Sequence, residues 1–140
     1  MGNVNLGRVL LGGIVAGLVL NIGEWVLNGI VLAKDMQDFF KKCNLPEPGS
    51  SFLVIAVGIT FVLGIVIVLG YAAIRSRFGP GPKTAIIAAL FAWFGVYLYQ
   101  NAIGFGLGII PIRLLVIALA WGLVEYILAT LAGAALYKEA

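Results

Sequence analysis

Apolar positions occur in four long blocks, with short polar segments between them. The blocks cover approximately residues 8–33, 52–74, 84–103 and 112–137. A helix needs about 20 consecutive apolar residues to cross the hydrocarbon core of a bilayer, and each block supplies them. The pattern predicts an all-α integral membrane protein. We expect a four-helix bundle whose helices run antiparallel, up-down-up-down, with short loops.

The composition supports this assignment to the membrane. Of the 140 residues, 62% are hydrophobic and 11% are charged, against about 25% charged residues in soluble domains. A soluble chain of this size could not bury so many apolar side chains, because a small domain has a large surface relative to its volume. Little chain lies outside the four blocks, so we expect a single transmembrane domain over residues 1–140 that contacts the lipid bilayer.

The segments between the blocks carry turn and interface signals. The stretch "RSRFGPGPK" at 75–83 contains two prolines without backbone donors and two glycines, which end the second helix before the third begins. The stretch "KDMQDFFKKC" at 34–43 spaces apolar residues three and four apart. This spacing predicts a short amphipathic segment in the headgroup layer, with a lid or a docking surface for a partner as the alternative.

Basic residues indicate the orientation in the membrane. Five of them belong to one side if there are four crossings: Arg8, Arg75, Arg77, Lys83 and Lys138. The other four belong to the opposite side: Lys34, Lys41, Lys42 and Arg113. The acid-free cluster at 75–83 favours a cytoplasmic position for both termini. Because these residues sit at segment ends and form no basic stripe, we expect no nucleic-acid partner.

The residue types also bound the chemistry. The chain has no histidine and one cysteine, Cys43, so it offers no intramolecular disulfide and no spacing typical of metal ligands. We expect no cofactor, no metal and no catalytic residue. The first apolar block is about twice as long as the apolar core of a signal peptide, so we expect it to be retained as a helix.

One face of the first predicted helix carries a stripe of small and polar residues. Its members are separated by four, four, three and four positions: Gly13, Gly17, Asn21, Glu24 and Asn28. Small residues let helix backbones approach closely in lipid, and polar side chains form hydrogen bonds between helices. This face is therefore predicted to contact protein. "GIVAG" at 13–17 also matches the GxxxG packing motif.

The fourth predicted helix repeats the pattern around a second acid. Its stripe consists of Ala118, Gly122, Glu125, Ala129 and Gly133. We interpret Gly13, Gly17, Gly122 and Gly133 as packing notches. From a rise of about 1.5 Å per residue, Glu24 lies about 15 Å from Lys34, and Glu125 lies about 18 Å from Arg113.

These distances place the two acids at nearly the same depth, where they could face each other. Neither acid has a basic residue nearby on its own helix. An isolated charge is costly in a low dielectric, so we expect at least one of Glu24 and Glu125 to hold a proton at pH 7. Its hydrogen-bond acceptor would be Asn21, Asn28, a backbone carbonyl or the other acid.

The third predicted helix adds polar residues near its outer end. Tyr97 and Gln100 share a face, and Asn101 lies beside them. They could form a polar vestibule leading toward the acids. The alternative is an aromatic belt at the membrane interface, with the amides hydrogen-bonded locally.

Three functions fit these features. The first is an accessory or structural membrane subunit, in a homo-oligomer or a larger complex, whose Glu and Asn faces hold helices or protomers together. The second is a small transporter or channel, oligomeric because four helices are few for a pathway, in which Glu24 and Glu125 carry protons or bind a cation. The third, least favoured, is a membrane enzyme on a lipophilic substrate, with the paired carboxylates as acid and base.

Three stretches carry a resemblance to known proteins: "GEWVLNGIVLAKD", "AAIRSRFGPGPKTA" and "RLLVIALAWGLVEYILATLAGAALY". With these, most of the chain resembles small four-helix membrane proteins found in bacterial genomes, for which no function is assigned. The resemblance implies a multi-pass protein of a bacterial inner membrane. It implies no mechanism, ligand or catalytic residue.

Overall fold

The computed structural model describes residues 3–139, and their regular secondary structure is helical. Four helical spans have the length and composition to cross a membrane. They are α1 (Leu6–Val26) with the π-helical η1 (Leu27–Val31); α3 (Ser50–Phe78); α4 (Pro82–Trp93), the π-helical η2 (Phe94–Leu98) and α5 (Tyr99–Gly106); and α6 (Ile112–Leu136). The predicted all-α chain with four membrane-length helices is confirmed.

The second span is longer than predicted, ending at Phe78 and not near residue 74. Its last turn contains Arg75 and Arg77, and basic side chains there interact favourably with the negative end of the helix dipole. Gly79 follows with a φ of 83°, in the left-handed region that glycine adopts at no steric cost, and ends the helix. Pro82 then occupies the first position of α4.

A short helix, α2 (Ala33–Lys42), follows the first span. Its range nearly coincides with the amphipathic segment predicted at 34–43. Arg113, at the start of α6, forms an ion pair of 2.8 Å with Asp35 of α2. This pair ties α2 to the beginning of the fourth span. The position of α2 in the headgroup layer stays a prediction.

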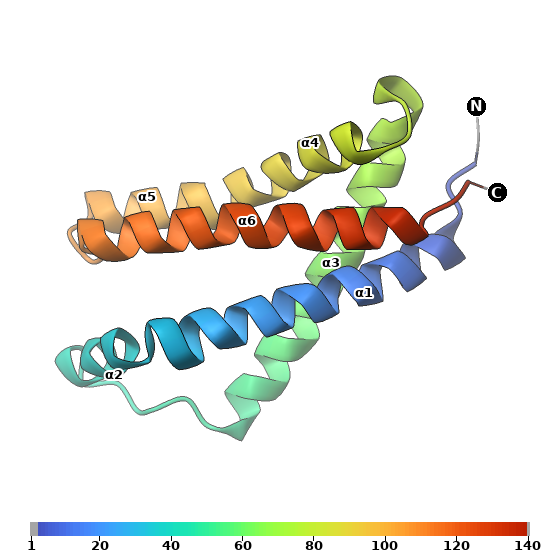
Figure 1. Ribbon diagram of the computed structural model, residues 1–140. Helices are drawn as coiled ribbons and strands as arrows, with labels where there is room; N and C mark the ends of the chain where they lie inside the picture. The colour runs from blue at the N-terminus through green and yellow to red at the C-terminus, as the bar shows by residue number, and fades with distance from the viewer. Residues whose placement is uncertain (1–2, 140) are drawn as a thin grey trace.

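Figure 1 shows α6 lying between α1 on one side and α4–α5 on the other, while α3 crosses them at a steep angle. Both ends of the described chain meet at one end of the molecule, where the backbone N–H of Asn5 donates a 3.3 Å hydrogen bond to the Tyr137 hydroxyl. The end of α3 is close by, since Arg75 Nε lies 3.8 Å from a Glu139 carboxyl oxygen. A regular antiparallel bundle stays a prediction.

Glycines form the closest helix–helix contacts. At the α1–α3 crossing, a Cβ on Gly64 would lie 2.5 Å from the carbonyl oxygen of Gly13 and 2.7 Å from Cα of Gly17. At the α1–α6 crossing, a Cβ on Gly133 would lie 2.7 Å from the carbonyl oxygen of Gly12. In lipid, where helices gain no hydrophobic free energy by meeting, such close packing is a main source of association.

Candidate functional site

Glu24, near the end of α1, is half-buried and receives two hydrogen bonds. The Tyr97 hydroxyl of η2 donates to one of its carboxyl oxygens. The side-chain amide of Asn28 in η1 donates to the other at 2.8 Å. An ionised carboxylate is a pure acceptor, so two donors suit the charged form of Glu24.

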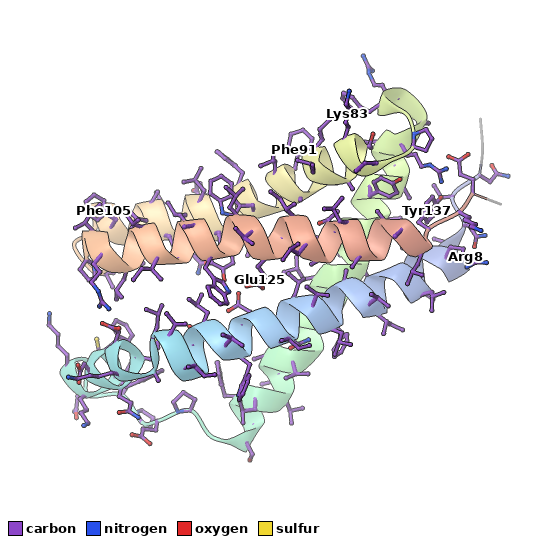
Figure 2. All side chains as sticks on the ribbon, viewed as in Figure 1. Arg8, Lys83, Phe91, Phe105, Glu125 and Tyr137 are labelled. Carbon is purple, nitrogen blue, oxygen red and sulfur yellow. The ribbon has the colours of Figure 1, made fainter. Side chains whose placement is uncertain are left out.

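Glu125, in the middle of α6, has the opposite surroundings. Only 5% of the residue is exposed. Among residues 3–139, no group donates to or accepts from either of its carboxyl oxygens. Figure 2 shows its side chain pointing from α6 toward α1. A buried charge without donors is costly, so these surroundings suit a protonated, neutral Glu125.

The two acids lie together across the α1–α6 contact. A Cβ on Gly23 would lie 2.6 Å from the carboxyl carbon of Glu125, so this side chain rests on the α1 backbone beside Glu24. Glu24 follows Gly23 directly in α1, so the backbone of Glu24 lies next to the Glu125 carboxyl group. Gly23 therefore acts as the notch that admits Glu125.

Aromatic rings enclose the acids. The Tyr97 ring packs on Gly122, where a Cβ would lie 2.6 Å from it, and meets the Tyr126 ring edge to face at a centroid distance of 5.4 Å. Trp121, one turn before Glu125 on α6, has a buried indole N–H without a hydrogen-bond partner in the described chain. Residues four apart share a helix face, so this donor and the unpaired Glu125 carboxyl are neighbours.

Asn28 and Tyr97, the two residues that bond Glu24, both lie in π-helical segments. Single π-helical turns within α-helices are rare, and those that occur are often found at functional sites. The sequence gives no signal for either turn. Trp121 and Tyr126 do lie beside the predicted stripe of Glu125 by helical spacing.

The other predicted polar residues lie outside this cluster. Asn21 donates to its own helix at Gly17 O, 2.8 Å away, and more weakly to Val57 O of α3 at 3.5 Å. Asn101 likewise donates to Tyr97 O at 2.8 Å. Gln100 is exposed. The amides thus mostly satisfy backbone carbonyls one turn earlier, and only Asn28 also reaches an acid.

The cluster of Glu24, Asn28, Tyr97, Trp121, Glu125 and Tyr126, hereafter the acid cluster, is closed toward the chain ends. On that side, Leu20 lies one turn before Glu24 and is 1% exposed, and Ala129 lies one turn after Glu125 and is 0% exposed. Within residues 3–139, no three His, Cys, Asp or Glu side chains are grouped as a metal site would require. The arrangement joins the first and third spans through hydrogen bonds to Glu24 and packs Glu125 of the fourth span against the first.

Comparisons of the chain with known protein families, with curated proteins and with solved structures found no match. Its function has to be inferred from these residues.

Proposed function

We propose that this chain is an accessory or structural membrane subunit whose acid cluster holds its own helices in register. The observation that carries the proposal is the pair of donors on Glu24. Tyr97 and Asn28 connect η2 to α1 and η1 through one carboxyl group. A hydrogen bond in hydrocarbon has no bulk water as competitor, so it can fix the relative position of spans that are otherwise held by packing alone.

We further propose that α3 supplies the contact with a second copy or a larger membrane complex. Several side chains of its first half are exposed, with Val54 73% and Ile59 62% exposed, although Val57 and Phe61 contact α1. The proposed setting is a bacterial inner membrane, with both termini cytoplasmic and residues 1–140 forming a single domain. The spans would run up-down-up-down as an antiparallel bundle.

A second candidate, proton- or cation-coupled transport, is favoured by one observation. Glu125 is buried with no hydrogen-bond partner in the described chain, whereas a side chain that serves only as a link between helices would use its polar atoms. Glu24 lies next to it as an acceptor. The pair could therefore exchange a proton, and an ionisable residue within a membrane span is a candidate functional site.

One set of variants separates the two candidates. Glu24→Gln and Glu125→Gln keep the side-chain shape but cannot carry a proton. Glu24→Gln also exchanges one of the two acceptor oxygens of Glu24 for an N–H donor. Purified protein is reconstituted in liposomes containing a pH-sensitive dye, and proton flux is measured beside thermal unfolding. Glu47→Gln, in the exposed loop before α3, is the matched control.

For a structural subunit we expect no flux in any form, with Glu125→Gln unfolding within a few degrees of the wild type. Wild-type flux that Glu125→Gln abolishes while the fold is kept would overturn the structural proposal in favour of transport. The contact through α3 is tested by oxidative cross-linking of a Cys43→Ser, Val54→Cys variant in membranes. Cys43→Ser, Phe91→Cys, which exposes a thiol on α4, serves as its control.

A further inference from the structure

A shallow groove of about 300 Å³ runs along the outside of the molecule, away from the acid cluster. It lies between α3 and the α4–η2 span, and its lining residues are all apolar. They include Leu63, Gly70 and Ile74 of α3, and Ala88, Phe91 and Gly95 of the facing span. From Leu63 to Ile74 the groove follows α3 for about 16 Å, at about 1.5 Å per residue. This length is close to the hydrocarbon thickness of one leaflet, about 15 Å.

The groove continues into a more polar hollow at the end of α3. That hollow is lined by Ile74, Ser76, Arg77 and Phe78 together with Ala73. Ile74 lines both depressions, so they adjoin at this residue. Within residues 3–139, Arg77 forms no ion pair with an acid. The apolar groove, about one leaflet long, therefore adjoins a hollow that carries an unpaired positive charge.

Two glycines keep the groove open. A Cβ added to Gly70 or Gly95 would meet no atom within 4 Å. No close helix–helix contact therefore requires glycine at these positions, although glycine lowers helix stability relative to alanine. This contrasts with Gly64, six residues earlier on α3, which packs directly on α1.

We propose that this groove is a binding site for an anionic glycerophospholipid. One acyl chain lies along α3 between Leu63 and Ile74, and the headgroup phosphate contacts Arg77. The apolar lining matches the chain, and the guanidinium matches the phosphate in charge and geometry. The same end of the molecule carries Lys83, which increases the attraction for an anionic headgroup.

The test uses native mass spectrometry of the full chain in detergent. Phosphatidylglycerol and phosphatidylcholine with identical acyl chains are titrated in parallel. We expect the wild type to bind phosphatidylglycerol about fivefold more tightly, the factor expected from one basic residue at a membrane surface. Arg77→Gln should remove this preference, while Lys41→Gln, on exposed α2, should retain it.

The acyl-chain part of the site is tested by filling the groove. Gly70→Leu should weaken binding of both lipids. Gly58→Leu is the matched control, because a Cβ there also meets nothing within 4 Å but Gly58 does not line the groove. If Gly70→Leu does not fold, Gly95→Leu replaces it. Equal binding of the two lipids by the wild type, a preference that survives in Arg77→Gln, or unchanged binding after groove filling would overturn the proposal.

Discussion

The hydroxyl of Tyr97 donates a hydrogen bond to the carboxyl group of Glu24, which lies 73 residues earlier in the chain. The bond joins the π-helical turn of the third span to the first span, while the Tyr97 ring packs on Gly122 of the fourth. One side chain thus contacts two neighbouring spans in different ways.

Removal of the Tyr97 hydroxyl should destabilise the protein without changing its packing. Tyr97→Phe keeps the ring on Gly122 but leaves Glu24 with one donor, and we expect a loss of about 1–2 kcal/mol in the free energy of unfolding. Tyr99→Phe is the control, because Tyr99 is 61% exposed. Denaturant unfolding in detergent measures both variants. Equal stability of the two would contradict a structural role for the bond.

The glycines of α3 should differ sharply in their tolerance of a methyl group. Gly64→Ala places Cβ against Gly13 and Gly17, so α1 and α3 must separate, at a cost of about 1–3 kcal/mol. Gly70→Ala meets open space and should be neutral or stabilising by up to about 1 kcal/mol, because alanine favours the helix. Thermal unfolding of the two variants side by side checks this. A similar effect at both sites would argue against the α1–α3 contact.

The two acids should differ in protonation at pH 7. Glu24 has two donors and Glu125 has none, so we expect one carboxylate and one protonated carboxyl group. Infrared difference spectroscopy should show a protonated carboxyl band that Glu125→Gln removes and Glu24→Gln leaves in place. Two fully ionised carboxylates at pH 6 would refute the assignment.

Cys43 offers a direct measure of orientation. It is the one cysteine of the sequence, and it is exposed directly after α2. If both termini are cytoplasmic, this thiol faces outward, and a membrane-impermeant maleimide should label it in intact cells. Cys43→Ser provides the background signal. Labelling that requires permeabilised cells would reverse the proposed topology.

The sequence predicts much of the candidate site but not its connections. Spacing along single helices places Glu24 and Asn28 on one face, and the structure does bond them to each other. The partner in the third span could not be identified in this way. Tyr97, which bonds Glu24, lies in the π-helical turn η2, and no residue pattern marks that turn. Asn21 shares the stripe of Glu24 but faces α3, which contacts α1 along the part of the stripe from Gly13 to Asn21.

The sequence by itself determined that the chain is helical and has four spans of membrane length, because apolar block length and turn residues are local properties that do not depend on neighbours. Only the tertiary structure decided which faces meet. Steric fit at Gly64 and Gly133 sets the crossings of α3 and α6 on α1, and Gly23 admits Glu125 beside Glu24. Such contacts depend on the relative position of whole helices, which hydropathy cannot specify because lipid-facing and protein-facing residues are almost equally apolar.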